Sequence, residues 1–457
     1  MSETTLSGYI LVAPQESTYT YLIDRGGSVI HTWKSDYNAG LTATLTEDGH
    51  LFRAGKVEND HCIHGSGGVI EEYDWDGNLV WQYFYSDTEQ FQHHDFMVLP
   101  NGDILFIAGE IISGQEALAL GRDPAKLRDR YLVADKLVEV RPEGFSGGDV
   151  VWQWRAVDHI VQDVNPTKAT YGAVADHPEL IDFNYEGRPS FPDGWTHINS
   201  VDYDPETDRI LLSARNYNEI WIIDHSTTTA EAAGHSGGDS GSGGDLLYRW
   251  GNPEAYDAGS RADRQLHGQH DAKWIDDGLS GAGDILVFDN GADRLGGTYS
   301  RVLQITVPTT AAGDYYPEPD GAYGPSVPTW SYVAAVPTSY SSARMSGAQR
   351  LPGGDTLTTL GDSGTLVEVA PDGSTVWTWD AELSLLEDAA PGSETSVFYA
   401  TWYPDDYAGF AGRGLVAEDP FLGALVRAAT VSLDAALGQS RAIMTASPAS
   451  LLAGSQG

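Results

Sequence analysis

The chain has 457 residues and a formal net charge of −40 at pH 7, with 66 acidic residues against 26 Lys and Arg. Such an excess of negative charge argues against nucleic acid and anionic membranes as partners, because both would repel the chain. A hydrophobic content of 41% and an aromatic content of 11% argue against a disordered acidic chain and predict a folded protein with a large core.

The carboxylates are spread along the whole sequence, and most of the basic residues are arginines. This pattern favours a halophilic protein, since high salt screens the self-repulsion of an acidic surface. The N-terminal sequence lacks a basic segment followed by a long apolar one, and no apolar run has the length of a membrane-spanning helix. We therefore expect a cytoplasmic protein, with an extracytoplasmic location as the alternative if a leader has been removed.

Cys62 is the only cysteine, which excludes an intramolecular disulfide and a paired-cysteine metal or redox motif. It lies in the segment His61-Cys62-Ile63-His64, where one thiol and two imidazoles could bind a metal ion. The favoured alternative is a loop with incidental histidines. We expect no metal and no other cofactor.

One pattern recurs from the N-terminus onward: a short strand ends on Asp or Glu, a turn with Gly follows, and a second strand ends in Trp. The six units are Tyr21–Trp33, Ile70–Trp81, Leu137–Trp154, Ile220–Trp250, Val302–Trp330 and Leu366–Trp379. A second two-strand element follows most of them, at Leu41–Phe52, Asp95–Phe106, His197–Leu212, Asp271–Val287 and Gly347–Leu357. Four short strands per unit, without amphipathic helices between them, predict an all-β fold, a β-propeller of six blades.

The first strand, Tyr9–Pro14, is expected to close the ring by pairing with the last blade, which removes an exposed edge. Ser396–Tyr403 is another candidate partner for closure. Insertions interrupt the repeat at Ile111–Leu132, which we expect to be helical, and at Arg155–Gly194.

We assign residues 1–417 to the propeller domain and residues 418–457 to a short C-terminal helical extension. Asp419-Pro420 forms an N-cap and first-turn pair, and the apolar residues after it recur at helical spacing.

The segment Trp195–Asp224 reads as two strands joined by a turn at Asp204–Asp208. His197 and Asn199 are two residues apart, so a strand places both side chains on one face. Arg215 comes near them when the second strand folds back. An imidazole, a carboxamide and a guanidinium together suit an anion with several oxygens, whereas the alternative is a solvated hairpin face.

Histidines are concentrated at the start of the second element of several units: His93-His94-Asp95, His197, and His267-Gly268-Gln269-His270-Asp271. Because the first strand of each blade lines the central channel of a propeller, these segments can meet at one mouth of it. Each histidine taken alone could instead be a packed or surface residue.

These residues resemble the signature of the arylsulfate sulfotransferase family. The resemblance lies in Trp195-Thr196-His197-Ile198-Asn199-Ser200 with Ser213-Ala214-Arg215, in Gly268-Gln269-His270-Asp271-Ala272 with Phe288-Asp289-Asn290-Gly291, and in His93-His94-Asp95 ahead of Leu99-Pro100-Asn101-Gly102. It runs from about Gly8 to Trp379. It implies a propeller enzyme that moves a sulfuryl group from a phenolic sulfate to another phenol through a sulfated histidine, without a nucleotide sulfate donor or a metal.

The resemblance also implies roles for individual residues. His270 would be the nucleophile, and His197, Asn199 and Arg215 would hold the sulfuryl oxygens. His94 would be the acid and base that serves the leaving and the accepting phenol, with His93 as the less favoured choice for that role and otherwise a substrate-binding residue. The expected partners are a small phenolic sulfate donor and a phenol acceptor.

Two other classes of function stay open at this point. One is a metal-dependent propeller hydrolase of the lactonase kind, with carboxylates around a central Ca²⁺. The other is a propeller that binds a partner without catalysis. Unlike family members with an N-terminal β-sandwich and an export signal, this sequence begins with propeller strands, which leaves the location and the oligomeric state open.

Overall fold

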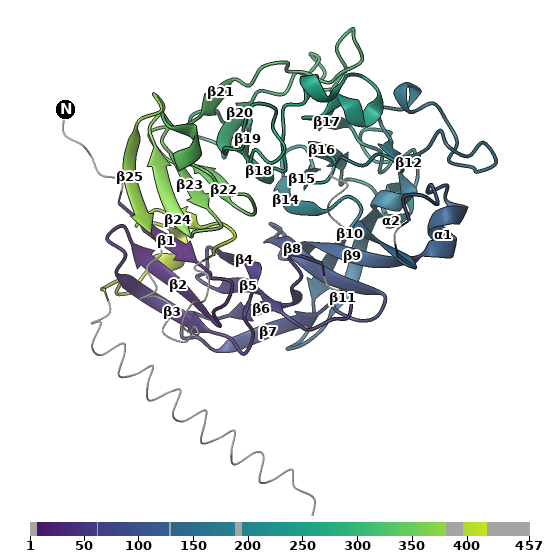
Figure 1. Ribbon diagram of the computed structural model, residues 1–457. Helices are drawn as coiled ribbons and strands as arrows, with labels where there is room; N and C mark the ends of the chain where they lie inside the picture. Colours follow the sequence, from purple (N-terminus) through teal and green to yellow (C-terminus); the bar gives the residue numbers. More distant parts are fainter. Residues whose placement is uncertain (1–6, 62, 128, 188–193, 381–395, 418–457) are drawn as a thin grey trace, which may run out of the picture.

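The computed structural model describes residues 7–61, 63–127, 129–187, 194–380 and 396–417. These residues form six four-stranded sheets arranged as a ring around a central axis (Figure 1). The predicted all-β, six-bladed propeller is therefore confirmed.

The strands of each blade run antiparallel, and the innermost strand of the ring is named first for each blade. Blade 1 consists of β26 (Thr401–Tyr403), β1 (Tyr9–Val12), β2 (Tyr19–Asp24) and β3 (Val29–Lys34). Blade 2 consists of β4 (Ala39–Leu45), β5 (Leu51–Lys56), β6 (Gly68–Tyr73) and β7 (Leu79–Phe84). Blade 3 consists of β8 (Gln90–Val98), β9 (Ile104–Ser113), β10 (Tyr131–Pro142) and β11 (Gly148–Arg155).

The second half of the ring repeats this order. Blade 4 consists of β14 (Ile198–Asp204), β15 (Arg209–Ala214), β16 (Glu219–Asp224) and β17 (Tyr248–Trp250). Blade 5 consists of β18 (His270–Trp274), β19 (Ile285–Asp289), β20 (Arg301–Ile305) and β21 (Trp330–Tyr332). Blade 6 consists of β22 (Gly347–Arg350), β23 (Thr356–Leu360), β24 (Thr365–Val369) and β25 (Thr375–Asp380).

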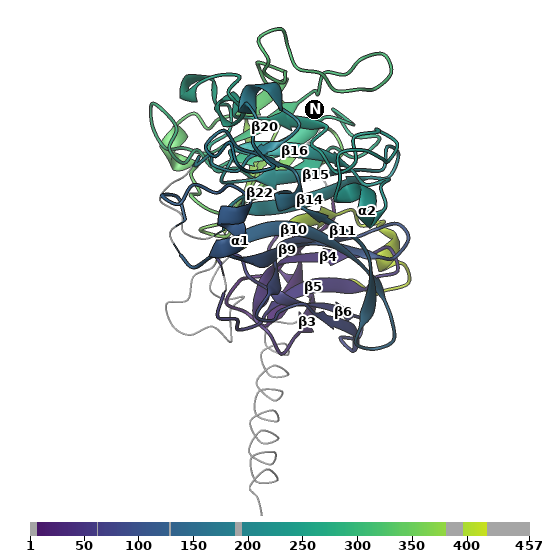
Figure 2. The same ribbon diagram turned by 90° about the vertical axis from the view of Figure 1, so that its right-hand side faces the viewer.

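The insertions carry the remaining elements. Helices α1 (Gly114–Ala119) and α2 (Thr229–Ala232) lie on the right-hand side of the ring in Figure 1, the side that faces the viewer in Figure 2. A short parallel pair, β12 (Ile160–Val161) and β13 (Ile181–Asp182), orders the insertion after blade 3.

The expectation of a helical insertion at Ile111–Leu132 is only partly correct. Helix α1 is a short piece of it, and both ends of the insertion extend the sheet instead, with Ile112 opposite Leu132 and Ser113 opposite Tyr131. The β-branched and aromatic residues at its two ends, Ile111, Ile112, Tyr131 and the adjoining Val133, favour strand pairing over a longer helix.

Ring closure joins the two ends of the described chain. β1 pairs with β26 in an antiparallel register that sets Tyr9 opposite Tyr403 and Leu11 opposite Thr401. Of the candidate partners for the first strand, the structure therefore uses the Ser396–Tyr403 segment. The predicted C-terminal helical extension, 418–457, lies outside the described residues. No described helix has the length and apolarity needed to cross a membrane.

The tryptophans that end the sequence repeat lie on the outermost strands and bind each blade to the next. Five indole N–H groups donate to backbone carbonyls: Trp33 to Asp74 (3.0 Å), Trp81 to Gly147 (2.8 Å), Trp154 to Gly244 (2.7 Å), Trp250 to Pro325 (2.8 Å) and Trp330 to Pro371 (3.0 Å). Between blades 6 and 1, Trp379 lies against the turn at Gly27, where a Cβ would overlap its indole. The recurring Trp is therefore an inter-blade contact.

Replacing one of these indoles should loosen the ring. We predict that Trp81→Phe lowers the free energy of unfolding by about 1 kcal/mol, because it removes the hydrogen bond to Gly147, whose carbonyl then keeps the Glu143 amide as its donor. Chemical denaturation measures the change. Tyr83→Phe is a matched control on the same strand, since the Tyr83 hydroxyl makes no hydrogen bond within the described residues. An equal effect of both substitutions would contradict the inter-blade role.

Candidate active site

The inner strands of blades 3, 4 and 5 bring three histidines to one end of the central channel. His94 lies within β8, His197 immediately precedes β14, and His270 begins β18. Each of these strands has a bulge in its pairing with the next strand at this point, between Gln92 and Phe96, Ile198 and Val201, and His270 and Lys273. Bulges change the direction of side chains relative to the regular alternation of a strand. Here a bulge lies at or next to each of the three histidines.

The backbone at two of these histidines is strained. His94 and His197 have φ values of +52° and +53°, a region that side-chain-bearing residues rarely occupy. The position of the His94 ring also requires a glycine at position 65, because a Cβ there would overlap the imidazole. The His94 amide in turn donates to the Gly65 carbonyl at 2.7 Å. Such strain at clustered polar residues is typical of functional sites.

A cavity of about 300 Å³ lies among these residues. His94, His197, His270 and Arg215 all contribute to its wall. The other wall residues are Gln15, Glu16, Ala39, Leu41, Lys56, Ile63, His64, Gly65, Ser66, Arg344 and Met345. The structure thus brings together four of the six predicted site residues in one small cavity with both cationic and apolar walls.

His94 lies at the centre of the cluster. Its ring is 4.7 Å from the His197 ring, centroid to centroid, at an interplanar angle of 76°. Burial, followed by the charges of His197, His93, His270 and Arg215, holds the pKa of His94 well below its usual value. These surroundings therefore favour a neutral imidazole at this position.

His270 is held in one tautomer by Asn290. The Asn290 amide nitrogen donates to the carbonyls of Ser342 and Met345, both at 2.8 Å, so its oxygen must face the His270 ring. That oxygen lies 2.7 Å from Nδ1 of His270 and accepts its proton. Nε2 is then the unprotonated nitrogen, and the Met345 amide donates to it weakly at 3.2 Å.

Arg215 follows β15 and is 98% buried, since its exposed fraction is 2%. Its backbone N–H donates to the His197 carbonyl at 3.2 Å, which fixes the two residues beside each other. A buried guanidinium in a cavity wall offers several fixed donors for the oxygens of an anion. The predicted proximity of His197 and Arg215 therefore follows from the strand pairing of blade 4.

The other two predicted residues lie behind the cavity wall. The Asn199 amide nitrogen donates to the backbone carbonyl of Gln269 at 2.8 Å, which ties blade 4 to the strand that carries His270. His93 is fully buried and contacts His94 and Asp135. Neither residue belongs to the cavity wall.

Three further wall residues were not among the predicted site residues. Lys56 and Arg344 add cationic groups, and His64 places one histidine of the His61–His64 segment in the wall. His61 packs edge-on against Tyr131 instead, and Cys62 lies outside the described residues. The family motifs do not include these positions, but the concentration of His near Gly65 was a usable signal.

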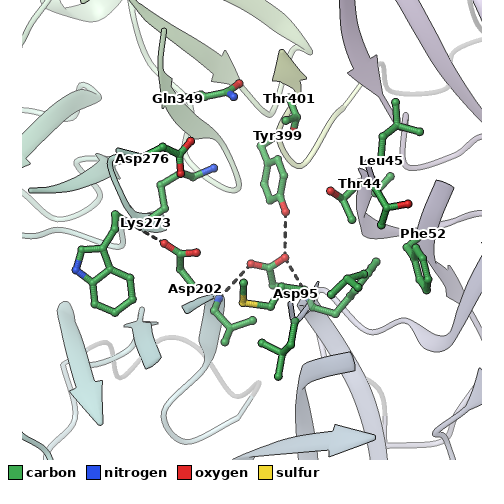
Figure 3. Close-up of a pocket in the computed structure, with 18 of the residues that line it drawn as sticks. Thr44, Leu45, Phe52, Asp95, Asp202, Lys273, Asp276, Gln349, Tyr399 and Thr401 are labelled. Carbon is green, nitrogen blue, oxygen red and sulfur yellow. Dashed lines mark hydrogen bonds between the residues drawn. The ribbon is translucent and has the colours of Figure 1, made fainter. Parts of the chain in front are cut away.

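The opposite end of the channel has a different chemistry (Figure 3). A larger cavity of about 1070 Å³ there contacts Asp95, Asp202, Asp271, Lys273 and Tyr399. Burial raises the pKa of Asp202 to about 7 and that of Asp95 to about 6. The Lys273 ammonium lies 2.9 Å from Asp271, so the carboxylate end has its own internal cation.

One group of described residues has a composition suited to a metal ion: His159, His235 and Asp245, whose ligand atoms lie within 4.8 Å of one another. Both Nδ1 atoms lie 2.8 Å from the same Asp245 oxygen, which is a hydrogen-bonding distance. His159 stacks on Trp154 of the outermost strand of blade 3. This group therefore fastens an insertion at the outside of the ring.

The arrangement of these motifs matches a known protein family. The model of the arylsulfotransferase (ASST) family matches residues 1–300. The chain belongs to the arylsulfotransferase family. Membership implies a transferase that acts on aryl sulfates. The matched span of this arylsulfotransferase includes His94, His197, Arg215, His270 and Asn290.

A comparison with curated proteins finds no match. Among solved structures, a protein of unknown function from Bacteroides caccae is similar at 9% identity and a TM-score of 0.47, over 87% of this chain and 98% of that one. Virginiamycin B lyase from Staphylococcus aureus is similar at 10% identity and a TM-score of 0.39, over 83% and 85%. The periplasmic gluconolactonase of Pseudomonas aeruginosa is similar at 13% identity and a TM-score of 0.39, over 82% and 95%. At this level, these similarities carry no information about function.

The contact between Gly65 and His94 gives a direct test of the site. We predict that Gly65→Ala lowers the turnover of an aryl sulfate by about tenfold or more, because displacing a reacting group by about 1 Å is costly. The stability of the fold should change little beyond the strain of a positive φ. Gly77→Ala is the matched control, since Gly77 has a similar φ of +81° but open space around it. Equal activities of the two variants would contradict the placement of His94.

Proposed function

We propose that this arylsulfotransferase transfers a sulfuryl group from a phenolic sulfate ester to a phenol through a sulfated His270. The single observation that carries the proposal is the contact between His270 and Asn290, which leaves Nε2 of His270 unprotonated at a cavity lined by Arg215 and His197. A neutral imidazole held in one orientation is a competent nucleophile at neutral pH. The weak hydrogen bond from the Met345 amide to Nε2, 3.2 Å long, gives way when sulfur approaches. The reaction needs no nucleotide sulfate donor.

The charges around the cavity support an anionic substrate. Arg215, Lys56 and Arg344 outnumber the one carboxylate in the wall at the histidine end, that of Glu16, although Arg344 is also paired with Asp362 at 3.2 Å. Carboxylates dominate the other end of the channel. An aryl sulfate is therefore attracted to the histidine end and repelled from the opposite one, despite the net charge of −40. Leu41, Ile63 and Met345 give the same cavity apolar surface for the aromatic ring.

In the first half-reaction, Nε2 of His270 attacks sulfur and forms an N–S bond while the S–O bond to the aryl group breaks. The electron pair of the broken bond stays on the phenol oxygen, which takes a proton from His94. Arg215 and His197 meet the charge on the sulfuryl oxygens with fixed donors, and such preorganised donors are a large source of rate enhancement. The sulfated His270 and a neutral phenol result.

In the second half-reaction, an acceptor phenol takes the place of the first product. His94 removes the proton of its hydroxyl group, the oxygen attacks sulfur, and the N–S bond breaks to restore His270. Because donor and acceptor phenols are chemically alike, one cavity of about 300 Å³ serves both in turn. Asn199 lies outside the cavity wall and helps to position His270 through its hydrogen bond to the backbone carbonyl of Gln269.

The two other classes of function fit the described residues less well. The carboxylate end of the channel pairs Asp271 with the Lys273 ammonium, and an internal cation among these acids disfavours a central Ca²⁺ site. A purely binding propeller gives no reason to gather buried His94, His197 and His270 around one cavity at the expense of backbone strain.

Steady-state kinetics tests the two-step route. We predict parallel lines in double-reciprocal plots when donor concentration is varied at several acceptor concentrations, because the first product leaves before the acceptor binds. 4-nitrophenyl sulfate is a suitable donor and a simple phenol a suitable acceptor, in buffer of high salt. Lines that intersect would show a direct transfer between two bound phenols and would contradict the sulfated intermediate.

The tautomer of His270 gives a second test. We predict that Asn290→Leu lowers kcat by about tenfold or more, since it removes a hydrogen bond of about 1–1.5 kcal/mol that holds Nε2 free of its proton. Asn290→Asp should keep the orientation of the ring and retain more activity. Ser300→Ala, which removes a buried hydroxyl that donates to the Asn290 backbone carbonyl, is the control for local packing. Wild-type activity of Asn290→Leu would contradict the assignment.

A further inference from the structure

The proposed reaction requires His94 to exchange protons with two phenols, although its surroundings disfavour a positive charge on its ring. His94 must give a proton to one phenol and take a proton from the next, yet four cationic or ionisable groups face it: His93, His197, His270 and Arg215. A positive charge localised on the His94 ring would be repelled by all of them. A second ionisable group outside the cavity is therefore needed to carry the positive charge in place of His94.

His93 and Asp135, which follow His94 in a chain of contacts away from the cavity, are arranged to carry this charge. Nδ1 of His94 lies 2.8 Å from Nδ1 of His93, and Nε2 of His93 lies 3.0 Å from Oδ1 of Asp135. His93 and Asp135 have no solvent exposure. The chain of contacts runs from the cavity wall at β8, the innermost strand of blade 3, outward to β10 of the same blade.

Hydrogen bonds from its neighbours stabilise the negative charge of the Asp135 carboxylate. Its second oxygen accepts hydrogen bonds from the Thr196 hydroxyl and, at 2.7 Å, from the Ile198 amide. Burial alone raises the pKa of Asp135, but the hydrogen bond from His93, the charge of His93 and the bonds from Thr196 and Ile198 outweigh it and lower the pKa. Asp135 is thus an anion buried beside an imidazole, which is the environment that stabilises an imidazolium.

We propose that His93 and Asp135 are positioning residues that form a proton relay behind His94, an inference that rests on the proposed function. The catalytic proton enters and leaves at Nε2 of His94, whereas the positive charge rests on His93 beside Asp135. The role is distinct from contact with substrate, since neither residue reaches the cavity wall.

The proton balance of the relay has two states. Before the first half-reaction, His93 carries protons on both nitrogens, His94 accepts from it at Nδ1, and Nε2 of His94 bears a proton. When Nε2 gives this proton to the leaving phenol, Nδ1 of His94 takes one from Nδ1 of His93. His93 keeps the proton shared with Asp135 and becomes neutral. The acceptor phenol then returns a proton to Nε2 of His94, and both transfers reverse.

His94 thus remains neutral in both states, which agrees with its surroundings. The positions of its two nitrogens also fit the scheme. Nδ1 faces His93, so Nε2 lies at the other edge of the ring, beside Gly65 in the cavity wall. The Gly65 backbone lies against this edge, and a Cβ at position 65 would overlap Nε2, so the edge can meet a phenol oxygen only while position 65 is glycine.

The leaving group distinguishes a relay from a merely structural contact. General acid catalysis matters for phenyl sulfate, whose phenolate is strongly basic, and matters little for 4-nitrophenyl sulfate, whose phenolate leaves unaided. In a two-step reaction, kcat/KM for the donor reports the first half-reaction alone. We predict that Asp135→Asn lowers kcat/KM about 10- to 100-fold for phenyl sulfate and about threefold or less for 4-nitrophenyl sulfate.

The pH profile of the same variant has a defined direction. Without the carboxylate, an imidazolium at His93 loses its counter-ion, and the protonated form that the first half-reaction requires is lost at lower pH. The descending limb of kcat/KM for phenyl sulfate should therefore move to lower pH in Asp135→Asn. His93→Gln, which cannot pass a proton, should show the same dependence on the leaving group and supports the test if Asp135→Asn does not fold.

Asp245→Asn is the matched control, because Asp245 forms a similar contact with His159 at the outside of the ring, 2.8 Å apart. It should leave the ratio between the two donors unchanged. Equal losses for both donors in Asp135→Asn and His93→Gln, or no loss for either, would overturn the relay while the unchanged protein still turned over both esters. Failure of the unchanged protein to turn over either ester would overturn the proposed function and the relay together.

Discussion

The pairing of β1 with β26 is the contact on which the site depends, because it closes the ring with strands from the two ends of the described chain. His94, His197 and His270 are far apart in sequence and come from three different blades. They share one cavity only when the blades are held at fixed angles around the axis. The indole hydrogen bonds from one blade to the next help to fix these angles around the ring.

The electrostatics of the channel follow from the same geometry. The inner strands place the imidazoles at one end of the channel and Asp95, Asp202 and Asp271 at the other, and Arg215, which follows the second strand of blade 4, joins the imidazoles. A chain with a net charge of −40 thereby offers an anion one buried, positively charged cavity. The acidic surface keeps the protein dispersed, whereas local burial decides which substrate charge is accepted.

The sequence predicted the fold well because the repeat is local. Each Trp unit corresponds to an outer pair of strands, and the start of the following element to an inner strand. The relation of His197 to Arg215 also followed, since a hairpin is a short-range structure. The roles of Asn290 and Asp135 could not be predicted, because their contacts with His270 and His93 depend on side-chain packing. The insertion at Ile111–Leu132 was misjudged for a similar reason, since pairing between its ends overrode helix formation.

The central claim is that His270 carries the sulfuryl group between two phenols. The most direct measurement is mass analysis of the protein after incubation with 4-nitrophenyl sulfate in the absence of an acceptor, under alkaline quench to preserve the N–S bond. The account predicts a mass gain of one sulfuryl group, located in the peptide that contains His270 and lost when phenol is added. An unmodified peptide at that position, in protein that still transfers sulfate, would contradict the account.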